Sequence, residues 1–161
     1  DAAGATLIVI GSLHGNEPGG AIALRKISEQ LEELRPKLRG RVYFLAGNTR
    51  ALARGVRFID SDLNRHWTAE NLTKNQFDAP DSPLSSEDCE QRELLAIINE
   101  ILATAEAEVF ALDLHSTSAE GLPFATVGDT MRNRRFARKF PVTILLGIEE
   151  QLDGTMLEYL N

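Results

Sequence analysis

Residues 7–17 read Leu-Ile-Val-Ile-Gly-Ser-Leu-His-Gly-Asn-Glu, and this stretch determines how the rest of the chain is arranged. Its first part, Leu7 to Ile10, is entirely apolar and ends at a glycine, which predicts a short buried strand. His14 and Glu17 follow the strand. A histidine after a strand is usually a hydrogen-bonded structural residue, and a glutamate in a first helical turn complements the helix dipole. The pair alone is therefore a weak indication of a metal site.

A second apolar run, Val109 to Leu112, ends in Asp113-Leu114-His115-Ser116-Thr117. It predicts another strand, central in its sheet and buried on both faces. If the two strands are parallel, His14, Glu17 and His115 meet at the carboxyl edge of the sheet, where α/β proteins bind ligands. Two histidines and one carboxylate are a ligand set for catalytic zinc and leave its fourth position free for water. We therefore expect one zinc ion per chain, with Asp113 able to orient an imidazole.

The remaining periodicity predicts helices and strands in alternation. We expect further strands at 42–46, 124–127 and 142–146, and helices at 17–34, 85–105, 130–139 and 154–160. Such alternation is typical of an α/β fold, a three-layer sandwich around a mostly parallel (mixed) central sheet. No linker or internal repeat divides residues 1–161, which indicates one domain.

Residues 48–83 lack periodicity, and a segment this long inside a compact domain is usually functional or disordered. It contains Arg57, Asn64 and Arg65, and arginine binds carboxylates through a rigid, always-charged fork. The plainer interpretation is that these arginines pair with Asp60 and Asp62 on the surface. Beside a metal site, anchoring of a small substrate with one or more carboxylates is the better hypothesis.

Composition narrows the partners further. A net charge of −7 argues against nucleic acid and anionic membranes, and it requires that any anionic substrate be held by a local arginine cluster. The apolar runs are far too short for a membrane span. Cys89 is the only cysteine, so no disulfide forms within these residues, which favours a cytoplasmic, reducing compartment. We interpret Cys89 as an inert thiol. His66 has no carboxylate at ligand spacing and is interpreted as a loop or pocket-wall residue.

Four motifs in order resemble the succinylglutamate desuccinylase and aspartoacylase family, relatives of the zinc carboxypeptidases. They are His-Gly-Asn-Glu at 14–17, Asn48 followed by Ala51, Arg57-Phe58-Ile59-Asp60-Ser61-Asp62-Leu63-Asn64-Arg65, and Asp113-Leu114-His115-Ser116-Thr117. The resemblance implies a zinc carboxypeptidase-like fold and zinc on His14, Glu17 and His115. It also implies that Arg57, Asn64 and Arg65 bind substrate carboxylate, and that Arg57 helps stabilise the oxyanion.

Members of this family hydrolyse the amide bond of N-acylated acidic amino acids such as N-succinylglutamate or N-acetylaspartate. A glutamate acts as general base, and the resemblance implies that it lies beyond residue 161, before a C-terminal β-domain. Glu149 and Glu150 do not match the motif and are interpreted as part of a solvated turn. Two alternatives stay open: a zinc carboxypeptidase acting on peptides, and a metal-binding module without catalysis. The acyl group and the amino acid are not specified by these residues.

Overall fold

Strand β1 (Thr6–Gly11) is the centre of the main sheet. The computed structural model describes residues 4–34, 37–76, 83–148 and 151–160. Strand β1 pairs in parallel with β2 (Arg41–Ala46) on one side and with β3 (Val109–Leu114) on the other. Gly11 lies in register with Ala46 and with Leu114, so all three strands end at one edge. The motifs that follow β1 and β3 are therefore brought side by side, as expected.

The position of β3 differs from the expectation. It was expected to be a central strand buried on both faces, but in the described sheet it lies at the edge and is only partly buried. The central position belongs to β1, in which Ile8, Val9 and Ile10 are all buried. A continuous apolar run indicates a strand covered on both faces, but it carries no information on the order of strands in a sheet.

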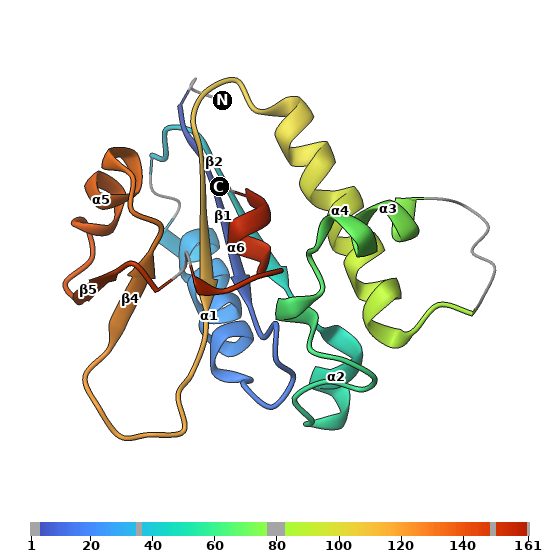
Figure 1. Ribbon diagram of the computed structural model, residues 1–161. Coiled ribbons are helices and arrows are strands. Elements are labelled where there is room, and N and C mark those ends of the chain that lie inside the picture. The colour runs from blue at the N-terminus through green and yellow to red at the C-terminus, as the bar shows by residue number, and fades with distance from the viewer. Residues whose placement is uncertain (1–3, 35–36, 77–82, 149–150, 161) are drawn as a thin grey trace.

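Helices cover both faces of this sheet (Figure 1). Helix α1 (Gly19–Leu34) packs on one face, and α4 (Ser86–Thr104) and α6 (Met156–Leu160) pack on the other. Ile8 and Ile10 point toward α4 and form the main core with its apolar residues, which are Leu94, Leu95, Ile98 and Ile101, joined by Leu13, Leu63, Trp67 and Met156. Helix α4 begins where expected, because Ser85 and Asp88 form a capping box at its N-terminus.

The remaining strands form a second small sheet. Strands β4 (Phe124–Val127) and β5 (Thr143–Leu146) pair in parallel, and α5 (Met131–Ala137) connects them. Every strand pair in the described residues is thus parallel, which agrees with the mostly parallel arrangement that the alternation of helices and strands predicted. The strands divide into sheets of three and two. None of the described helices combines the length and apolar character needed to cross a membrane.

The segment from residue 48 is more ordered than its lack of periodicity indicated. It contains α2 (Thr49–Arg54), a short 3₁₀ helix η1 (Leu63–Arg65) and α3 (Ala69–Gln76). The side chain of Asn48 caps α2, and that of Asp62 caps η1. These elements are too short to give a readable apolar period, and side-chain caps stabilise their ends instead.

Candidate metal centre

The loop after β1 is shaped by two unusual positions. Ser12 has a positive φ of 64°, which is uncommon for a residue other than glycine. Its hydroxyl donates to the carbonyl of Glu17 at 2.9 Å and so holds the loop closed. Gly15 lies against α2, where a Cβ would come within 2.1 Å of the carbonyl carbon of Ala51. The close approach permits only glycine and fixes the direction in which His14 leaves the loop.

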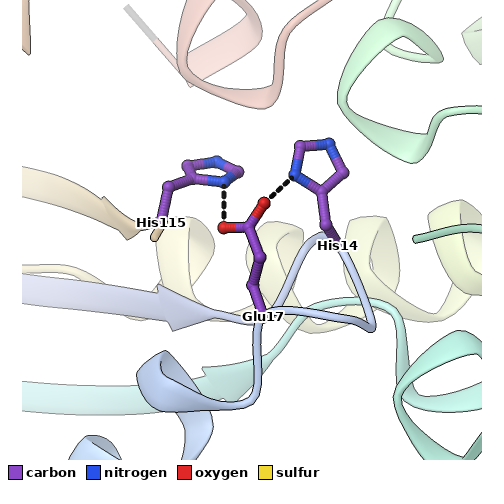
Figure 2. A group of neighbouring side chains, drawn as sticks. All are labelled: His14, Glu17 and His115. Atoms are coloured by element: carbon purple, nitrogen blue, oxygen red, sulfur yellow. Dashed lines mark hydrogen bonds and ion pairs between the residues drawn. The ribbon is translucent and has the colours of Figure 1, made fainter. Parts of the chain in front are cut away.

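Three side chains converge from this loop and from the end of β3 (Figure 2). His14 Nδ1 lies 2.9 Å from Glu17 Oε1, and His115 Nδ1 lies 3.2 Å from Glu17 Oε2. One ligand atom from each residue lies within 4.8 Å of the others, so the group can hold a metal ion. His14 and Glu17 are buried, whereas the side chain of His115 is 31% exposed and opens the group to solvent.

Each histidine has a second carboxylate behind it. His14 Nε2 lies 3.0 Å from Asp62 Oδ1, and His115 Nε2 lies 2.6 Å from Asp113 Oδ2. When Nε2–H donates to its carboxylate, the Nδ1 lone pair of each ring faces Glu17. Three electron-pair donors then surround one point, an arrangement that a cation stabilises. Carboxylates that orient ligand histidines in this way are a common feature of zinc sites, so the donor set fits zinc.

Glu17 is held as an anion. Burial raises the pKa of its carboxyl group, but hydrogen bonds and nearby charges outweigh that effect, and the net pKa lies below the ordinary 4.5. The backbone N–H of Ser116 donates to Oε2 at 2.7 Å, and the rings of His115 and His14 add their charge. Glu17 is therefore available as a negative ligand at neutral pH.

Asp113 and Glu17 favour the protonated form of His115. Burial lowers the pKa of His115, but the hydrogen bond and charge of Asp113, with the charge of Glu17, raise it above the ordinary 6.5. Burial raises the pKa of Asp62, and the hydrogen bonds from Arg57 and the charge of His14 lower it below 3.8. Without a cation, the nearby carboxylates favour a proton on His115, and a metal ion would compete with that proton.

Arg57 lies beside the three side chains and is paired with Asp62. Its Nη2 donates to Asp62 Oδ2 at 3.0 Å, and its Nη1 lies 3.8 Å from Glu17 Oε1. The plainer interpretation of this arginine, an ion pair with a nearby aspartate, is therefore correct as far as it goes. Its side chain is still 47% exposed, and one aspartate does not occupy all five of its N–H donors.

Asn64 and Arg65 are neighbours in the chain, but only Asn64 contacts one of the three converging side chains. Asn64 Nδ2 lies 3.4 Å from His115 Nε2, and its Oδ1 accepts from the backbone of Met156, so this residue joins the site to α6. Arg65 is exposed, and its Nη1 donates to the carbonyl of Asn64 at 2.6 Å. His66 contacts other residues than the three candidate metal ligands: its Nε2 lies 3.0 Å from Asp88 Oδ1, which agrees with a structural role.

Two carboxylates were not predicted as parts of the site. Asp62 was considered only as a partner for arginine, yet it also orients His14 from 48 residues away. Glu87, at the start of α4, binds the loop that leads to Asp62 through three backbone N–H groups. Nothing in local spacing connects either residue with His14. Glu149 and Glu150 lie outside the described residues.

A family model for the succinylglutamate desuccinylase/aspartoacylase catalytic domain matches residues 3–157. The chain belongs to this family. It is 30% identical over 133 residues to a probable aspartoacylase of Acaryochloris marina, a match that covers 81% of this chain and 41% of that protein. It is also 32% identical over 76 residues to a succinylglutamate desuccinylase of Pseudomonas fluorescens, covering 47% and 23% of the two chains.

Solved structures of the family have the same fold. The succinylglutamate desuccinylase of Vibrio cholerae superimposes with a TM-score of 0.73 at 22% identity, over 97% of this chain and 45% of that one. The fold is thus that of the succinylglutamate desuccinylase/aspartoacylase family, which is zinc carboxypeptidase-like. The chain spans less than half the length of the relatives it matches.

Proposed function

We propose that the chain is the metal-binding and substrate-anchoring part of a zinc-dependent amidohydrolase that cleaves N-acylated acidic amino acids. The observation that carries the proposal is the convergence of His14, Glu17 and His115 beside the exposed guanidinium of Arg57. Membership in the family supports the reaction class. One zinc ion per chain, on the three side chains, would supply Lewis acidity toward the amide carbonyl and a lowered pKa for the attacking water.

The chain's own residues would bind and orient the substrate. Arg57 would receive a carboxylate of the substrate through the N–H donors that Asp62 leaves free, and would hold negative charge that develops on the amide oxygen. We propose Asn64 and Arg65 as further carboxylate donors at the same rim. Arg65 would have to turn from the carbonyl of Asn64 to reach a ligand. A net charge of −7 leaves this local cluster as the feature that attracts an anion.

We further propose that the general base lies beyond residue 161. Each described carboxylate that contacts the two histidines is already engaged, Glu17 as ligand and both Asp62 and Asp113 as orienting groups. None of them is free to take a proton from water and return it to the leaving amine.

We propose that the protein works in a reducing compartment such as the cytoplasm. The single cysteine, Cys89, is a free thiol, which supports this proposal.

The test compares metal content and hydrolysis in the complete natural protein. N-acetylaspartate, N-succinylglutamate and a neutral N-acyl amide are assayed with wild type, Arg57→Ala and the control Arg54→Ala, an exposed arginine on α2. We expect about one zinc per chain, hydrolysis of an acidic substrate, and a KM raised about tenfold or more by Arg57→Ala alone. Absence of zinc, or equal hydrolysis of neutral and acidic amides by the wild type, would overturn the proposal.

A further inference from the structure

Glu87 is a completely buried carboxylate outside the group of metal-binding side chains. It lies in the first turn of α4 and is 0% exposed. Among the described residues no lysine, arginine or histidine forms an ion pair with it. Its charge is instead balanced by four hydrogen bonds, which together fill both oxygens: Oε1 accepts from Asn48 Nδ2 and Ile59 N, each at 2.9 Å, and Oε2 accepts from Asp60 N at 2.9 Å and Ser61 N at 3.2 Å.

Three of these donors belong to residues 57–62, a short loop that leads to the site and is called the substrate loop below. The loop begins at Arg57, whose carbonyl accepts from the backbone N–H of Gly15 at 3.1 Å. It ends at Asp62, which contacts both His14 and Arg57. The backbone N–H groups held by Glu87 therefore lie between the two residues that touch the candidate metal and substrate sites. A shift of this loop would move the guanidinium of Arg57 and the carboxylate behind His14 together.

The fourth donor connects the same carboxylate to the sheet. Asn48 is 0% exposed, and its backbone N–H donates to the carbonyl of Ser12 at 2.9 Å, directly after β1. Glu87 thus joins the substrate loop to the strand end from which His14 arises. Asp60 completes the connection from the other side, because its Oδ2 accepts from the N–H of Ser86 at 2.7 Å.

We propose that Glu87 is a positioning residue for substrate binding, which sets the place of Arg57 relative to the metal ligands through the backbone of residues 59–61. This role rests on the proposed function of the site. Only a carboxylate meets the demand, because all four groups that face it are N–H donors. A glutamine would turn an NH₂ group toward two of them, so those hydrogen bonds would be lost and donors would face donors. Burial raises the pKa of Glu87, but the hydrogen bonds lower it below 4.5, so the acceptor form is present at neutral pH.

Glu90 offers a matched control. It lies one turn further along α4, is 1% exposed, and also accepts a backbone N–H, that of Arg50 at 2.8 Å. Its contacts hold α2 and not the loop with Arg57. Glu90→Gln therefore removes a buried carboxylate of the same helix but leaves every hydrogen bond of the loop with Arg57 in place.

The experiment measures, in the complete natural protein, the ratio of kcat/KM for an N-acyl acidic amino acid to that for its neutral amide analogue. With zinc kept in excess, so that any weaker metal binding does not limit the assay, we expect Glu87→Gln to lower this ratio about 10- to 100-fold, mainly through KM. Glu90→Gln should leave the ratio within about twofold, because loss of folded protein affects both substrates equally. Asp60→Ala, an exposed change, should lower the ratio in the same direction and decides the matter if Glu87→Gln does not fold.

An unchanged ratio in Glu87→Gln, or an equal fall in both glutamate variants, would overturn the role of Glu87 and leave the proposed function of the site standing. A wild-type protein that does not discriminate between the two substrates would overturn the proposed function and this role with it. Hydrogen exchange separates the cases further. Glu87→Gln should speed exchange at the amides of residues 59–61, whereas Glu90→Gln should not.

Discussion

The hydrogen bond between Asp113 and His115 gives a measurable prediction for metal affinity. Asp113 Oδ2 lies 2.6 Å from His115 Nε2, and the Asp113 side chain is 3% exposed, so this is a short, charge-assisted contact with a buried carboxylate. It places the proton of the neutral ring on Nε2 and leaves the Nδ1 lone pair toward Glu17. In Asp113→Asn, the amide NH₂ can donate to Nε2 instead and move the ring proton to Nδ1, the nitrogen that the metal needs.

The expected loss follows from the strength of that contact. A hydrogen bond to a charged group contributes about 1.5–3 kcal/mol net, and loss of such an orienting partner typically costs 10- to 100-fold in metal affinity. At about 1.4 kcal/mol per factor of ten, the two estimates agree. We therefore expect the zinc Kd of Asp113→Asn to rise about 10- to 100-fold at pH 7.5.

The assay is a zinc titration against a chromogenic chelator, with the tautomer of His115 followed by nitrogen NMR of the imidazole. Asp129→Asn serves as the control, because it removes one negative charge on the exposed surface at the start of α5. It should leave the Kd within about twofold. A Kd for Asp113→Asn that equals the wild-type value, with Nδ1 still unprotonated, would refute the role given to Asp113.

Other predictions concern stability. Burial raises the pKa of Asp88, but hydrogen bonds from its neighbours hold this pKa well below 3.8. The contribution of Asp88 to stability is therefore present above pH 3.8 and is lost as the pH falls further. Thermal melts from pH 7 to 2 should show this loss, and Asp88→Asn should reduce the pH dependence and lower the Tm at pH 7. Gly15→Ala should cost about 1–3 kcal/mol and weaken zinc binding, because its Cβ would meet the backbone of Ala51 at 2.1 Å; an unchanged Tm and zinc Kd would contradict the close approach. Ile98→Ala should cost about 2–5 kcal/mol in urea unfolding, because Ile98 is 0% exposed, whereas Ile97→Ala, at 43% exposure, should cost about 0.5 kcal/mol or less; equal losses would show that the core is misplaced.

Sequence reasoning reached the three candidate ligands because each lies next to a strong local signal. Apolar runs locate the ends of β1 and β3, and parallel pairing then brings His14, Glu17 and His115 together. Asp113 was predicted for the same reason, because it lies two residues from His115 at the end of the same apolar run. Their role as metal ligands stays a prediction that the zinc titration tests.

The rest depended on contacts between distant segments. Asp62 reaches His14 across 48 residues, and Glu87 reaches Ser61 across 26, through a loop whose path no local pattern encodes. The edge position of β3 is of the same kind, because apolarity indicates burial of a strand and not its neighbours. Arg65, predicted from its residue type to bind substrate, lies exposed with its guanidinium on a neighbouring carbonyl, and its role in substrate binding stays a prediction.

The contact between Glu17 and His115 has a consequence for how the chain acquires its structure. The two residues are 98 positions apart, and their side chains meet only when β1 and β3 are paired. Such non-local pairing is the slow part of folding, because loop-closure entropy must be overcome before the contact forms. A metal ion that needs all three side chains would bind only after this step, and at about 100 times its Kd would stabilise the paired state by about 2.7 kcal/mol. The rate of metal uptake during refolding would then report when β1 and β3 pair.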